Sequence, residues 1–206
     1  MFYEMRTYML KPGTVDEFEK RFEEALPTRE KYSKLGAFWH TELGPMNQVI
    51  HVWPYEDLKQ REEVRDAAGK DPSGDWPPKS GDMILNMHSE ILISAPFMRP
   101  LSNQRLGDIY EMRTYTYRPG TIPEVIKRWS EVIQAREEYS PLAACWFTEL
   151  GALNRWIHVW AYRDMQHRNE IRAEASKNPK WPAPTREFML SQDVKILAPA
   201  SFSPMH

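Results

Sequence analysis

Cysteine is almost missing from this chain of 206 residues, in which Cys145 is the only one. A single thiol excludes a disulfide framework within the chain, and it excludes the cysteine-rich zinc and iron–sulfur sites as well. Long apolar runs are also missing, so no membrane span is expected. The lone cysteine favours a reducing compartment. The opening residues lack signal and transit character, and they predict a cytoplasmic protein.

A surplus of positive charge is missing too, because 27 Lys and Arg face 29 Asp and Glu, which gives a net charge of −2. Without a basic field that could hold a phosphate backbone, nucleic acid is not expected as a partner. The sequence contains no glycine-rich phosphate loop, no serine nucleophile elbow and no HExxH zinc motif. No cofactor is therefore predicted.

Tryptophan and proline are abundant, with eight and 17 residues, and an internal repeat accounts for much of the tryptophan. The segment YEMRTY at 3–8 returns at 110–115, and residues 3–68 are identical to residues 110–175 at 35 of 66 positions without a gap. This duplication predicts two copies of one small domain. We place them at 1–95 and 108–206, with a linker rich in turn residues at 96–107.

Within each copy, hydrophobic periodicity and turn residues predict the order strand, helix, strand, strand, helix, strand. In the first copy the strands are expected at 2–10, 38–43, 48–53 and 83–93, and the second helix at 57–68. Thr14 and Glu17 predict a capping box at the start of the first helix, and Pro27 is expected to kink or close it. Two such βαββαβ units predict an α+β fold of antiparallel sheets with helices on one face.

Alternation along the third strand divides its residues between two faces. We assign Ile50 and Val52, with Trp39 from the preceding strand, to the face covered by helices. The opposite face is then free to pack against the sheet of the other copy; it carries Asn47, Val49, His51, Trp53 and Tyr55. The result is a half-polar interior, formed within one chain as an internal pseudo-dimer or between chains as an obligate homodimer. A homodimer or higher homo-oligomer is expected.

The stretch WHTELGPMNQVIHVWPY at 39–55, followed by Arg61, resembles the signature of the NIPSNAP family. YEMRTY with the Pro-Gly that follows at 12–13 is similar to the first strand of that family, and both copies match over nearly their whole length. The resemblance implies two ferredoxin-like units of the dimeric α+β barrel superfamily. It supplies no established catalytic residues, and it connects the eukaryotic members with mitochondria, vesicle traffic and mitophagy.

His51 and His158 are the strongest candidates for chemistry. Each is expected on a barrel-facing strand, near Glu42 or Glu149 across a hairpin, where an imidazole can act as a base or a proton relay. The competing interpretation is a histidine that is hydrogen-bonded into the wall. A metal site is not expected, because too few ligands gather here and His40 has no histidine counterpart in the second copy.

Other polar and aromatic residues of the same face are candidate ligand contacts. They are Arg6, Glu42, Asn47, Trp53 and Tyr55 in the first copy and Arg113, Glu149, Asn154, Trp160 and Tyr162 in the second. Each also has a structural interpretation, as a member of an ion pair, a turn residue or an aromatic core residue. The arginines of the second helix, at 61 and 65, are interpreted first as a solvated face and second as a partner-binding surface. The Trp-Pro loops at 76–78 and 181–182 are expected to form a lid or a contact surface.

Two classes of function stay open. The first is a small-molecule-binding barrel, with cofactor-independent enzymatic activity on an aromatic or acidic substrate as an extension. The second is a non-catalytic interaction or scaffold protein, whose polar barrel only stabilises the fold. The first class requires a cavity that is bordered by His51 or His158 and open to solvent. The second predicts a filled barrel with both histidines satisfied.

Overall fold

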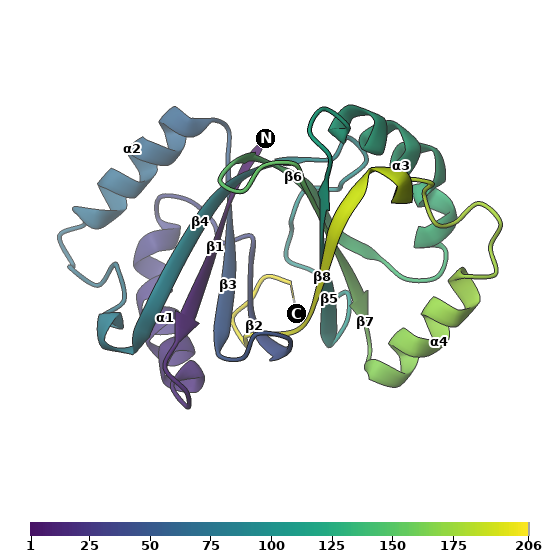
Figure 1. Ribbon diagram of the computed structural model, residues 1–206. Coiled ribbons are helices and arrows are strands. Elements are labelled where there is room, and N and C mark those ends of the chain that lie inside the picture. Colours follow the sequence, from purple (N-terminus) through teal and green to yellow (C-terminus); the bar gives the residue numbers. More distant parts are fainter. Residues whose placement is uncertain (206) are drawn as a thin grey trace.

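The computed structural model describes residues 1–205 and contains two α+β units with the same order of elements (Figure 1). The first unit consists of β1 (Phe2–Leu10), α1 (Val15–Glu30), β2 (Ala37–Leu43), β3 (Gln48–Tyr55), α2 (Leu58–Gly69) and β4 (Ile84–Ser94). The second consists of β5 (Ile109–Tyr117), α3 (Ile122–Glu137), β6 (Leu142–Leu150), β7 (Arg155–Tyr162), α4 (Met165–Ala175) and β8 (Met189–Pro199). A short 3-10 turn precedes the last strand of each unit, at Gly81–Met83 and Arg186–Phe188. The predicted βαββαβ order is confirmed.

All eight strands form one closed antiparallel barrel in the order β1-β3-β2-β8-β5-β7-β6-β4. The two units are joined at two seams, where β2 pairs with β8 and β4 pairs with β6. Trp39 lies opposite Pro199 at the first seam, and Ser94 lies opposite Trp146 at the second. The barrel therefore closes within one chain, as the internal pseudo-dimer predicted. No second chain is needed to complete the sheet, and the homo-oligomer stays a prediction.

The barrel interior is apolar and filled with side chains. Trp39 and Trp146, both fully buried, lie in it together with methionines, alanines and β-branched residues. Each tryptophan touches a tyrosine of the other unit, because the Trp39 and Tyr110 rings lie 5.6 Å apart and the Trp146 and Tyr3 rings 5.8 Å. Leucines and a methionine of the segment between β4 and β5 pack against the same core. This shared core holds the two repeats together.

The two faces of each sheet are the reverse of our sequence-based assignment. Ile50, Val52 and Trp39 point into the barrel, whereas Trp53 and Tyr55 pack under the helices. The interior of an eight-stranded barrel is wide enough for side chains to fill it, and charged groups buried there would lose their hydration. The face with the ionisable groups therefore turns outward, where helices cover it only in part. In Figure 1 α1 and α2 flank the barrel on one side and α3 and α4 on the other.

The helix boundaries correct two further expectations. Thr14 makes no side-chain cap, because its hydroxyl donates to the Lys11 carbonyl of the preceding turn at 2.8 Å. Glu17 instead accepts from Arg21, so the capping box does not form. Pro27 does not close α1, which has 16 residues, as many as α3.

Within residues 1–205, no helix combines the length and the apolar character that crossing a bilayer requires.

Candidate ligand-binding pockets

Each repeat contains a pocket between the outer face of its sheet and its helices. The first has a volume of about 310 Å³ and the second about 350 Å³, which is within the usual range for small-molecule sites. Strands β1 and β3 supply the floor of the first pocket, and α1, α2 and the loop before β4 supply its sides. The second pocket is built in the same way from the equivalent elements. A cavity bordered by each histidine therefore exists, but outside the barrel.

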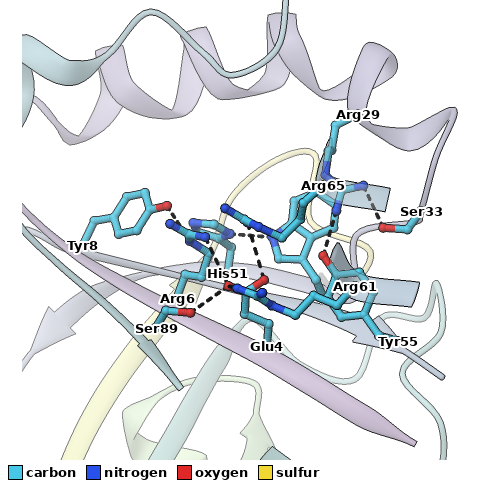
Figure 2. A network of polar contacts seen from close by, with 11 residues as sticks. Glu4, Arg6, Tyr8, Arg29, Ser33, His51, Tyr55, Arg61, Arg65 and Ser89 are labelled. Atoms are coloured by element: carbon cyan, nitrogen blue, oxygen red, sulfur yellow. Dashed lines mark hydrogen bonds and ion pairs between the residues drawn. The ribbon is translucent and has the colours of Figure 1, made fainter. Parts of the chain in front are cut away.

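A buried glutamate anchors the charged side of the first pocket, as Figure 2 shows. Glu4 accepts hydrogen bonds from Arg61 at 2.6 Å and Arg6 at 3.1 Å. Ser89 donates at 2.7 Å, and the Arg65 Nη1 lies 3.6 Å from the other carboxylate oxygen. Burial alone would raise the pKa of Glu4, but the hydrogen bonds from Arg61 and Ser89 and the nearby arginine charges lower it to about 2. Glu4 is therefore an anion, and it orders the arginines around it.

The second repeat has the same cluster. Glu111 is fully buried and pairs with Arg168, with Arg172 at 3.4 Å and with Arg113 at 3.6 Å. Val194 replaces Ser89 at the equivalent position of the last strand, opposite the arginine of the first strand. The arginines of the second helices were interpreted as a solvated face. That interpretation is wrong, since they reach inward to the glutamates.

A further arginine enters each pocket from the first helix of the repeat. Arg29 is 2% exposed and donates to the hydroxyls of Ser33 and Tyr55, both at 2.8 Å. Its guanidinium lies 4.3 Å from the ring centre of Trp53, a distance that suits a cation–π contact. Arg136 repeats this arrangement with Ser140, Tyr162 and Trp160. These side chains pair with neutral groups, so their charge adds to the positive potential of the pocket.

Each histidine is held in one tautomer by the tryptophan two residues later. The indole N–H of Trp53 donates to Nδ1 of His51 at 2.7 Å, and Trp160 donates to His158 in the same way at 2.7 Å. Burial, reinforced by the charge of Arg6, lowers the pKa of His51 to about 3. Burial and Arg113 likewise hold the pKa of His158 well below its usual range. Both imidazoles are thus neutral and carry their proton on Nε2.

The pocket walls carry positive charge and aromatic rings but no acid. Among the described residues, three arginines line the first pocket and four line the second, and no aspartate or glutamate lines either. The tryptophans of the Trp-Pro loops, Trp76 and Trp181, also line the pockets, beside Trp53 and Trp160. The lid itself stays a prediction. A cavity of this kind suits a negatively charged molecule with a flat apolar part.

The structure brings about half of the candidate residues together. Arg6, His51 and Trp53 line the first pocket, and Tyr55 supports it from behind through Arg29. The second pocket is lined by Arg113, His158, Trp160 and Tyr162.

The remaining candidates lie elsewhere. Glu42 and Glu149 are exposed near the hairpin tips and line neither pocket, because the bulge at the end of each strand turns them to solvent. Asn47 and Asn154 occupy the left-handed region with φ of 58° in the β2–β3 and β6–β7 turns, a role that asparagine commonly has.

Arg29 and Arg136 were missed by the sequence reasoning, although a signal was present. Arg29 continues the apolar stripe of α1 through positions 18, 22 and 25, where a charge is out of place. It is also identical in the two repeats, while residues 25–28 all differ from residues 132–135. A charge on an apolar stripe points to a buried partner or a ligand site.

Within residues 1–205, no group of three or more His, Cys, Asp or Glu side chains is arranged to hold a metal ion.

Comparison with solved structures shows where the same fold occurs. A putative monooxygenase from Lactobacillus acidophilus has a TM-score of 0.66 at 12% identity, covering 97% of this chain and 94% of that chain. An anthrone oxidase-like protein has a TM-score of 0.61 at 8% identity, covering 100% and 94%. At such identities the likeness extends to the fold alone.

Comparison with curated sequences is more specific. The human protein NipSnap homolog 3A is 32% identical over 100% of this chain and 86% of its own length. The Drosophila melanogaster protein NipSnap is 25% identical over 98% of this chain and 78% of its own length. The family model described as NIPSNAP matches residues 3–99 and again residues 110–204. With both repeats matched, the chain belongs to the NIPSNAP family.

Proposed function

We propose that the protein binds small anionic molecules with a flat apolar body, one in each repeat. The observation that supports this most directly is the charge of the pockets. Three arginines surround each buried glutamate, and two of them line the cavity together with the arginine of the first helix, whereas the glutamate itself does not. The same arrangement around Glu111 in the second repeat makes a chance cluster a poor explanation. Any enzymatic activity would take place at this site.

Calorimetric titration with 2-naphthoate at low salt tests the proposal. We expect two molecules bound per chain, and weaker binding as salt rises, because the recognition is electrostatic. Arg65 and Arg172 line the pockets and keep about 40% of their side-chain surface exposed, so their replacement is not expected to unfold the chain. The double variant Arg65→Gln, Arg172→Gln should bind about tenfold more weakly, which corresponds to about 1.4 kcal/mol for a charge-assisted contact.

The matched control replaces two arginines that lie outside the pockets. Arg99 and Arg105 form exposed ion pairs on the segment between β4 and β5, and the variant Arg99→Gln, Arg105→Gln should bind 2-naphthoate like the wild type. The neutral compound 2-naphthamide has the same ring system but no charge. Its affinity for the wild type should be about as low as the affinity of 2-naphthoate for the Arg65→Gln, Arg172→Gln variant. Equal affinity for the acid and the amide would contradict recognition of an anion.

The interaction or scaffold function is the alternative to ligand binding. It predicts that neither the acid nor the amide binds, and that the pockets hold only water. The filled barrel interior agrees with this alternative, but the buried Nε2 atoms of both histidines lack a hydrogen-bond partner among the described residues. The alternative requires a filled barrel and fully satisfied histidines together, and the unpaired Nε2 atoms support ligand binding.

A further inference from the structure

Each pocket is lined by a histidine that has an unpaired hydrogen-bond donor among the described residues. The Nε2 atoms of His51 and His158 are buried and have no hydrogen-bond partner within residues 1–205. In the second pocket the buried Nε of Arg113 also has none. Leaving a buried donor unpaired destabilises the fold, and two repeats that have diverged at almost half of their aligned positions have both kept this arrangement.

The tyrosine beside each histidine adds to the donors. The Tyr8 and His51 rings are 4.9 Å apart, as are those of Tyr115 and His158. The Tyr8 oxygen accepts from Nε of Arg6 at 2.6 Å, which leaves its own proton for another acceptor. Burial raises the pKa of Tyr8 and of Tyr115, so both stay protonated.

We propose that the Nε2–H of His51 and of His158 donates to an oxygen of the bound molecule, and that the pockets select acidic hydroxyl compounds, phenols or enols, in their ionised form. This inference rests on the proposed function, and it specifies the chemical class of the ligand. It also changes the role of the histidines: they are donors that bind an oxyanion, and a base is excluded by the proton already on Nε2.

The selection follows from the groups that face the histidine. From β1 these are Glu4, Arg6 and Tyr8; from α1 and α2 they are Arg29 and Arg65. The carboxylate of Glu4 is occupied by arginines and Ser89 and does not line the pocket. A neutral hydroxyl would find no carboxylate for its proton in either pocket lining, whereas an oxyanion accepts from the imidazole and from the guanidinium groups. On binding, the ligand O–H bond breaks, the proton passes to bulk water, and no redox step is involved.

The probe is 4-nitrophenol, whose ionised form absorbs at longer wavelength than the neutral form. We expect the spectrum of the bound compound to show phenolate at a pH where the free compound is mainly phenol. Its apparent pKa should fall by about one to two units, because a hydrogen bond to a charged oxygen contributes about 1.5–3 kcal/mol. This measurement uses the unmodified chain, so it needs no variant to fold.

Two pairs of variants isolate the histidines from the arginines. His51→Phe with His158→Phe removes the Nε2 donors, and at least half of the pKa shift of the bound phenol should disappear. His51→Gln with His158→Gln keeps an amide that can accept from the tryptophan and donate to the ligand, and it should preserve most of the shift. The far-ultraviolet circular dichroism of all of these proteins should be alike, and this reports an intact fold.

The outcomes separate the two proposals. If 2-naphthoate binds and bound 4-nitrophenol keeps its ordinary pKa, the donor role is wrong while anion binding stands. The donor role is equally wrong if the phenylalanine variants retain the full shift. If neither probe binds at two sites per chain, anion binding fails, and the inference fails with it.

Discussion

Replacing Trp39 with alanine is expected to lower the free energy of unfolding by about 3–5 kcal/mol, the usual cost of deleting a large buried aromatic side chain. Trp39 is fully buried in the barrel, at the seam between β2 and β8. Its ring contacts Tyr110 of the other repeat. The void that the alanine leaves therefore lies where the two repeats pack against each other. A domain of ordinary stability, 5–15 kcal/mol, would lose a large fraction of it. Urea denaturation followed by circular dichroism measures the change.

The matched control is Leu85→Ala, which removes a large side chain that is 58% exposed and should cost less than about 0.5 kcal/mol. A double-mutant cycle between Trp39→Leu and Tyr110→Leu should give a coupling of about 0.5–1.5 kcal/mol, since the two rings are in contact across the repeats. The affinity for 2-naphthoate should not change in folded Trp39→Ala, because the residue lines neither pocket. If folded Trp39→Ala lost affinity for 2-naphthoate, Trp39 would belong to the binding pocket and not only to the barrel core.

The order and bounds of the elements could be predicted because each depends on local chemistry. The strand at 2–10 is bounded by a Pro-Gly turn, and Asp57 starts α2 by accepting the backbone N–H of Gln60 at 2.8 Å. The duplication supplied a second copy of every signal. Pro27 does not close α1, because its missing N–H costs one hydrogen bond while Phe22 and Leu26 of the same helix are buried in the core.

Which face of the sheet enters the barrel could not be decided from alternation alone. Both faces of β3 bury large side chains. Alternation along the strand therefore divides its residues between two faces but does not show which face points into the barrel. The deciding contacts are long-range: Arg61 reaches Glu4 on β1 from α2, and α2 flanks the barrel on its outside. The pocket depends on the same contacts, which explains why Arg6, His51 and Trp53 were correctly grouped while their surroundings were assigned to the wrong side of the sheet.

Acidification from pH 7 to pH 5 is expected to cost the protein about 4 kcal/mol of stability, about 2 kcal/mol for each of His51 and His158. Both pKa values are lowered by burial and by nearby arginines, so the folded chain keeps the imidazoles neutral. The unfolded chain protonates them below a pKa of about 6.5. Between these limits the unfolded state binds more protons, and stability therefore falls as pH falls. Glu4, with a pKa of about 2, adds its own loss only below about pH 4.5.

Urea denaturation at pH 7, 6 and 5 on the histidine variants measures this contribution. His51→Gln and His158→Gln should each remove about half of the pH dependence, and the double variant most of it. His40→Gln supplies a control of opposite sign: its hydrogen bond with Glu19 raises the pKa of His40, so that residue stabilises the fold more strongly in acid, and its loss should steepen the decline. If the double glutamine variant loses stability between pH 7 and pH 5 as steeply as the wild type, the histidines are not buried in the neutral form, and their Nε2–H atoms are not the fixed donors on which phenolate selection depends.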